Sequence, residues 1–128
     1  MQLTILAGEL AVCRLGVEQE VPPWVWRERE PLCSVTYTGD ECSIVCPAGV
    51  IPNGVQAERG WRVLKVLGPL DFALTGVLVS LAQPLAEQGI PIFALSTFDT
   101  DYLLVKEQAL SEAKTALEQA GHNFVSSP

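Results

Sequence analysis

The sequence predicts an α+β fold of two packed βαββαβ units, with antiparallel sheets and helices on one face of each sheet. Two observations carry this prediction. Between about residues 61 and 125, strand and helix periodicities follow one another in the order β-α-β-β-α-β. The first half has similar strand patterns without clear helices, so we interpret it as a degenerate copy of that unit. The expected division is residues 1–58 and residues 59–128.

The C-terminal unit opens with a strand at Trp61–Gly68, which has the pattern of a half-buried strand, with Trp61, Val63, Lys65 and Leu67 on one face and Arg62, Leu64 and Val66 on the other. A helix follows, with Asp71 and Thr75 both candidates for its N-cap and Gly89 for its C-terminal end. Pro84 lies inside this helix and removes one hydrogen-bond donor from it. The apolar face of the helix repeats at helical spacing in Leu74, Leu78, Leu81 and Leu85.

Three further elements complete this unit. Pro91–Ser96 and Thr100–Lys106 read as strands joined by a short turn at Phe98-Asp99. Glu107–Ala120 has the spacing of a second helix, and His122–Val125 fits a last strand. The pattern therefore predicts a four-stranded antiparallel sheet with both helices on one face, the ferredoxin-like arrangement.

The first half contains four strand patterns that form two expected hairpins: Leu3–Leu6 with Glu9–Leu15, and Pro31–Thr38 with Glu41–Cys46. The turns are expected at Ala7-Gly8 and at Gly39-Asp40. A sheet of about 60 residues is marginal by itself, so the two units are expected to pack on one another.

Composition excludes several classes of partner. The chain has 8 Lys and Arg against 15 Asp and Glu, a net charge of −7, and it has no basic cluster. Binding to nucleic acid or to an anionic membrane needs such a cluster, so neither is expected. The N-terminus lacks the features of a signal peptide, and no apolar run is long enough to span a membrane. A cytoplasmic location is expected.

The four cysteines predict no metal site. Cys42 and Cys46 lack the second Cys or His pair that zinc needs, and the chain has a single histidine, His122. We therefore expect reduced, buried thiols, no metal and no cofactor. His122 follows the helix-ending glycine and is interpreted as a helix cap or a surface residue.

The polar stretch STFDTD, residues 96–101, lies between two strongly apolar segments. A metal site would need further oxygen ligands, and a catalytic acid pair would need a nucleophile or base nearby; the chain offers neither convincingly. No catalytic residue is therefore predicted, and the protein is not expected to be an enzyme. Two interpretations stay open: a polar hairpin tip, which suits Asp99, and a ligand clamp, which suits Asp101.

Three motifs carry a resemblance to a known family: WRVLKV-x-GPLDF, the helix-opening LTG, and STFDTDYLLV. The segment that contains them resembles the ACT domain of the tandem-ACT amino-acid-sensing family, which includes CASTOR-type arginine sensors and short bacterial relatives. CSVTYTGDECSIVCP, from Cys33 to Pro47, resembles the first-domain hairpin of the same family. The resemblance covers the chain from Pro31 onward.

The resemblance implies a binding fold in which ACT units pair side by side and hold a small ligand, usually an amino acid, at their interface. The ligand would lie against the start of the first helix and the loop between the second and third strands. Matched residue by residue, the implied ligand-binding residues are Thr75, Gly76, Val77, Thr97, Phe98 and Asp101, with Ser34 and Val35 closing the pocket from the first unit.

The chemistry of these residues suits a free amino acid. A helix N-terminus binds a carboxylate, Gly76 allows close approach, and Asp101 can hold an ammonium group. Arginine sensors of this type carry an acid where this chain has Leu74, so a smaller or more apolar amino acid is at least as well suited. The predicted function is an amino-acid-binding regulatory module that forms a homodimer or binds a partner protein. The alternative is a ligand-free dimerisation or protein-interaction module with a vestigial pocket.

Overall fold

The computed structural model describes residues 1–71 and 73–126. It contains two compact units: Met1–Leu6 together with the chain from Arg62 onward (unit 1), and Ala7–Trp61 (unit 2). Strands β1 (Gln2–Leu15) and β4 (Ala57–Val66) contribute residues to both units. The sequence-based domain ranges, 1–58 and 59–128, stay a prediction. They assign the first residues to the N-terminal domain, whereas these residues belong structurally to unit 1.

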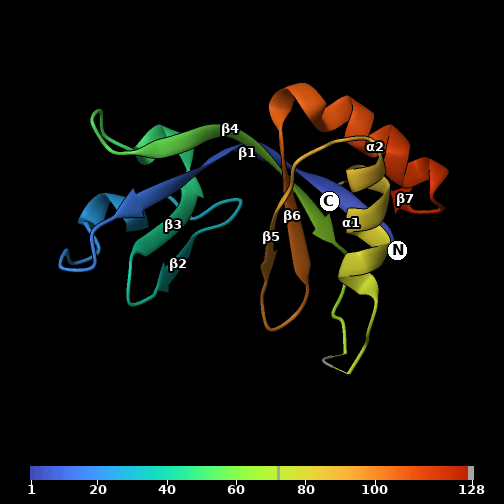
Figure 1. The fold of residues 1–128 in the computed structure, drawn as a ribbon, viewed down its shortest axis with the longest axis horizontal. Coiled ribbons are helices and arrows are strands. Elements are labelled where there is room, and N and C mark those ends of the chain that lie inside the picture. The colour runs from blue at the N-terminus through green and yellow to red at the C-terminus, as the bar shows by residue number, and fades with distance from the viewer. Residues whose placement is uncertain (72, 127–128) are drawn as a thin grey trace. The chain divides into compact units, whose positions relative to one another are not determined.

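Unit 1 has the predicted βαββαβ order (Figure 1). After β4 come α1 (Val77–Glu87), β5 (Phe93–Ser96) and β6 (Asp101–Lys106). A 3-10 turn at Glu107–Ala109 leads into α2 (Leu110–Gln119), and β7 (Asn123–Phe124) completes the unit. The α+β class and the ferredoxin-like arrangement are confirmed.

The core of unit 1 explains why both helices lie on one face of its sheet. Alternate strand residues form the sheet side of this core: Leu3, Leu64, Val66, Leu103 and Val105. The helices contribute residues at helical spacing: Val77, Leu81 and Leu85 from α1, and Ala113, Ala116 and Leu117 from α2. Figure 1 shows the two helices beside each other. Each fully buried leucine contributes about 1.5–3 kcal/mol through its removal from water.

The sheet of unit 1 includes the start of β1, which the sequence analysis assigned to the first half of the chain. β7 pairs in parallel with the start of β1, with Gln2 opposite Asn123 and Leu3 opposite Phe124. On the other side β1 neighbours β4, and the Leu67 amide donates to the Gln2 carbonyl at 2.9 Å. The predicted four-stranded sheet therefore contains a fifth strand between β4 and β7.

The predicted N-terminal hairpin at Ala7-Gly8 was wrong, because β1 runs without interruption from Gln2 to Leu15. The backbone at Gly8 has a φ of 102°, a conformation open to glycine. A glycine inside a strand commonly marks a local bend rather than a reversal, and the strand continues past it here.

Unit 2 has the element order of unit 1, with each helix reduced to a single 3-10 turn. The turn Pro23–Trp26 precedes the hairpin of β2 (Ser34–Tyr37) and β3 (Cys42–Pro47), and the turn Ala48–Val50 follows it. The strand order is β2-β3-β1-β4, the order expected for a βαββαβ sheet. The interpretation as a degenerate copy is confirmed, as is the hairpin predicted over residues 31–46.

The thiols of unit 2 are part of its core. Cys13, Cys42 and Cys46 are buried and pack in one apolar cluster with Ile44, and all four cysteines are free. The thiol of Cys13 and burial together raise the pKa of Cys46 well above its ordinary value, which keeps this thiol protonated. These cysteines therefore act as small apolar side chains.

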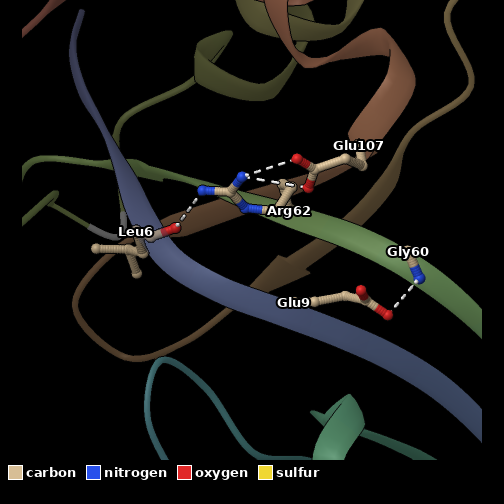
Figure 2. A network of polar contacts seen from close by, with 5 residues as sticks. All are labelled: Leu6, Glu9, Gly60, Arg62 and Glu107. Carbon is tan, nitrogen blue, oxygen red and sulfur yellow. Dashed lines mark hydrogen bonds and ion pairs between the residues drawn. The ribbon is translucent and has the colours of Figure 1, made fainter.

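Side-chain hydrogen bonds and an ion pair connect neighbouring elements within each unit (Figure 2). In unit 1, Arg62 Nη1 reaches both carboxylate oxygens of Glu107, at 3.3 and 3.2 Å, and Nη2 donates to the Leu6 carbonyl at 3.5 Å. One guanidinium thus connects β4, β1 and the turn before α2. In unit 2, the Gly60 amide donates to Glu9 Oε2 at 3.1 Å.

His122 contacts a carbonyl of α1 that Pro84 leaves without its usual hydrogen-bond donor. In a regular helix the Ser80 carbonyl would accept from the amide of residue 84, but proline has no N–H. His122 Nε2 lies 3.0 Å from this oxygen and donates to it. His122 is 7% exposed, so its interpretation as a surface residue was wrong: it is a buried partner for a carbonyl that the helix leaves free.

Candidate functional site

A cleft of about 280 Å³ lies in unit 1 between the start of α1 and the turn that joins β5 to β6. In Figure 1 the loop that precedes α1 and the β5–β6 turn extend in the same direction from the sheet. The described residues that line the cleft come from these two segments: Leu70, Asp71, Leu74, Gly76, Val77, Leu78, Ser96, Thr97, Phe98, Asp99, Thr100 and Asp101.

The first wall is the N-terminus of α1. The helix begins at Val77 after Gly76, whose φ of 79° is left-handed, and no side chain caps it. The predicted caps, Asp71 and Thr75, were therefore wrong: Asp71 instead accepts from the Ala73 amide at 2.8 Å and stabilises a turn. Because the first amides of a helix lack intrahelical acceptors, this wall offers N–H donors and a partial positive charge.

The second wall is the β5–β6 turn, which is fixed from both sides. Within the turn, the Thr97 amide donates to the Thr100 carbonyl at 2.9 Å. The buried Thr100 hydroxyl donates to the Val66 carbonyl at 2.7 Å, and the Asp99 carbonyl accepts from the Leu70 amide at 2.7 Å. These bonds join the turn to the end of β4 and to the loop before α1, so both walls of the cleft are held in place.

The cleft is negatively charged and partly apolar. Three carboxylates line it, from Asp71, Asp99 and Asp101, and Lys, Arg and His are absent from its described lining. Asp101 is half-buried, and its Oδ1 accepts from the Ser96 hydroxyl at 2.6 Å. The apolar part of the lining includes Leu74, Leu78 and Phe98, which are 51%, 42% and 79% exposed.

The structure brings together most of the residues that the sequence singled out for ligand binding. Gly76, Val77, Thr97, Phe98 and Asp101 all line the cleft. Thr75 is exposed beside Gly76 but is not among the lining residues. Ser34 and Val35 lie on β2 in unit 2, and their role in closing a pocket stays a prediction.

Sequence reasoning missed several lining residues, of which Ser96 and Asp71 matter most chemically. Ser96 is the first residue of the STFDTD stretch, and its hydroxyl donates to the Asp101 carboxylate across the turn. Polar side chains at directly opposite positions of two paired strands often hydrogen-bond in this way, so the predicted hairpin already contained a signal for this pair. Asp71 was considered as a helix cap, although the second candidate cap, Thr75, already indicated that the helix could start later.

Metal-binding clusters and membrane-spanning helices are both absent from the part of the chain that the structure describes. No group of three or more His, Cys, Asp and Glu side chains there could hold a metal ion. None of the described helices is long and apolar enough to cross a membrane.

Comparison with known proteins identifies the family. The model of the ACT domain matches residues 56–119, which include both walls of the cleft. The chain belongs to the ACT domain family. A second family model, described as an N-terminal domain, matches residues 8–54.

Curated relatives of this ACT protein include arginine sensors. The cytosolic arginine sensor for mTORC1 subunit 1 of Bos taurus is 42% identical over 60 residues, which are 43% of this chain and 18% of that protein. The human protein of the same name is 38% identical over 68 residues, which are 49% of this chain and 21% of the relative. The match thus spans about a fifth of the length of these relatives.

Solved structures share the fold over nearly the whole chain. A protein of Agrobacterium tumefaciens is 38% identical, with a TM-score of 0.90 over 99% of this chain and 93% of that one. The regulatory subunit of aspartate kinase from Thermus thermophilus has a TM-score of 0.63 over 89% of this chain and 93% of its own. At 12% identity, that second likeness shows the fold alone.

Proposed function

We propose that this ACT protein is an amino-acid-binding regulatory module with no catalytic activity of its own. The observation that carries the proposal is the cleft in which the N-terminus of α1 and the carboxylate of Asp101 line opposite walls. The names of the curated relatives, which are arginine sensors, support the same function. They also support a cytoplasmic location, because those relatives are named cytosolic.

The two walls suit the two charged groups of a free amino acid. The ligand carboxylate would accept from the first amides of α1, beside Val77, where the helix dipole favours negative charge. The ligand ammonium would bind the Asp101 carboxylate in a charge-assisted hydrogen bond. Phe98 and Val77 would cover the ligand and exclude water, which strengthens both interactions.

The charge of the cleft selects among amino acids. With three carboxylates in its lining, the cleft disfavours a ligand with an acidic side chain. This chain has Leu74 where arginine sensors of this type carry an acid, and that difference favours a ligand with a small or apolar side chain. Asp71 and Asp99 line the same cleft, so a second positive charge on the ligand would still find an anionic partner. Basic amino acids therefore remain within the proposed class.

A thermal-shift screen of the twenty amino acids tests this function. At about 100 times the Kd, a ligand stabilises the folded state by about 2.7 kcal/mol, which gives a clear rise in Tm. Asp101→Asn should abolish the rise, whereas Asp40→Asn, in an exposed turn of unit 2, should preserve it. If no amino acid shifts the Tm at millimolar concentration, the proposal fails.

A second function is favoured by the exposed apolar side chains around the cleft. Leu74, Leu78, Val79 and Phe98 are each at least 42% exposed, which suits a protein-interaction module whose pocket is vestigial. Such a module would form a homodimer, or bind a partner protein, in the same way with and without amino acids. Light scattering separates the two functions, because a sensor should change its mass or its partner affinity when ligand is added.

A further inference from the structure

Ser96 and Asp101 form a polar pair at the mouth of the β5–β6 hairpin. Ser96 is the last residue of β5, Asp101 is the first of β6, and the two face each other directly in the strand register. The Ser96 hydroxyl donates to Asp101 Oδ1 at 2.6 Å, the length of a charge-assisted hydrogen bond. Both residues line the cleft.

We propose that Ser96 is a positioning residue, which holds the Asp101 carboxylate in the orientation that receives the ammonium group of an amino acid. The inference rests on the proposed function and goes beyond it. With Oδ1 held by Ser96, the second oxygen of Asp101 is left for the ligand. An ordered carboxylate binds more tightly, because its rotamer freedom is already lost before the ligand arrives.

The hairpin itself does not need this hydroxyl. The turn is closed by the backbone bond from Thr97 to Thr100, at 2.9 Å, and is joined to β4 by the Thr100 hydroxyl. Ser96 is exposed, so its replacement by alanine leaves no cavity in the core. Its bond to Asp101 is therefore available for a role in binding rather than in folding.

The neighbouring negative charges favour rotation of the Asp101 carboxylate out of the cleft when Ser96 does not hold it. Asp71 and Asp99 line the same cleft, and like charges in one cleft repel each other. A free Asp101 side chain would reduce this repulsion by rotating toward bulk water. The Ser96 hydroxyl opposes that rotation, since a hydrogen bond to the carboxylate stabilises the inward orientation.

The test compares the wild-type protein with Ser96→Ala and Ser96→Thr in calorimetric titrations with L-lysine, L-arginine and L-alanine. For each amino acid that binds the wild type, Ser96→Ala should weaken the affinity about two- to tenfold, the range expected when binding must order one further side chain. Ser96→Thr keeps the hydroxyl and should restore the affinity to within about twofold. Equal affinity of the alanine variant and the wild type, or failure of threonine to restore binding, overturns the proposal.

A second readout needs no ligand. In NMR spectra of the free protein, the Hα–Hβ couplings of Asp101 should report one rotamer in the wild type and in Ser96→Thr, and an average over rotamers in Ser96→Ala. Equal couplings in all three proteins would contradict the positioning role even if amino acids bind. If none of the three amino acids binds but the couplings behave as expected, the binding function fails for these ligands while Ser96 still orders Asp101.

Discussion

Removal of the His122 side chain should destabilise unit 1 by leaving the Ser80 carbonyl without a donor. Pro84 cannot supply the usual helical N–H, and His122 Nε2 replaces it at 3.0 Å. In His122→Ala this partly buried acceptor loses its partner, which costs about 1–3 kcal/mol of unfolding free energy. The loss of imidazole packing and of the Nδ1 contact with the Met1 N-terminus adds a further cost, because the residue is only 7% exposed.

Pro84→Ala separates these two costs. Alanine at position 84 provides an amide that can donate to the Ser80 carbonyl, as in any regular helix turn. In that background His122→Ala should lose only its packing and the contact of Nδ1 with the Met1 ammonium, 3.1 Å away, so its effect should be smaller by about 1 kcal/mol or more.

Urea unfolding of the wild type, both single variants and the double variant gives this coupling free energy. Thr115→Ala is the control: its exposed hydroxyl bonds the Ser111 carbonyl within α2, so its effect should add to that of Pro84→Ala. Independent sites add to within about 0.3–0.5 kcal/mol. If the cost of His122→Ala is the same in both backgrounds within that range, His122 does not replace the missing amide.

Three further predictions concern other contacts. Thr100→Val should lower the free energy of unfolding by about 1–3 kcal/mol in urea, because the Val66 carbonyl loses its buried donor; an unchanged midpoint would contradict this. Gly68→Ala should cost about 1–3 kcal/mol, because the new Cβ would lie 3.0 Å from a backbone nitrogen, whereas Gly49→Ala meets open space and should have little effect; equal effects would refute the argument. In native alkylation followed by mass spectrometry, Cys33 should react first, although burial raises the pKa of its thiol, because the other three thiols are buried; equal labelling of all four would disprove it.

Local patterns predicted the elements of unit 1 but not all of their partners. β5 and β6 were found because alternation and a short turn are recorded in adjacent residues. The pairing of Gln2 with Asn123 joins opposite ends of the chain, and no local pattern contains it. Gly8 was misread for a related reason: a glycine suits a turn and a bent strand equally, and the distant strand partners decide between them.

The candidate site was predictable where its chemistry contrasts with its surroundings. Asp101 attracted attention as a carboxylate at the start of an apolar strand, and it lines the cleft. Asp71 was misassigned because aspartate favours both helix caps and turns, and only the backbone shows that α1 begins after Gly76. His122 was misassigned because the need for its donor arises at Ser80, far from it in sequence.

The placement of β1 beside β7 has a consequence for synthesis and for protein engineering. Unit 2 is contiguous, whereas unit 1 is interrupted by it: residues 1–6 are translated before unit 2, and their sheet is complete only after Asn123 and Phe124 have been made. A fragment that begins at residue 56, like the matched ACT segment, would lack this strand and leave open edges on β4 and β7, which invite aggregation. A circular permutant with residues 1–6 placed after Val125 would make unit 1 contiguous, and it would need a crossover linker of about a dozen residues because β1 runs parallel to β7.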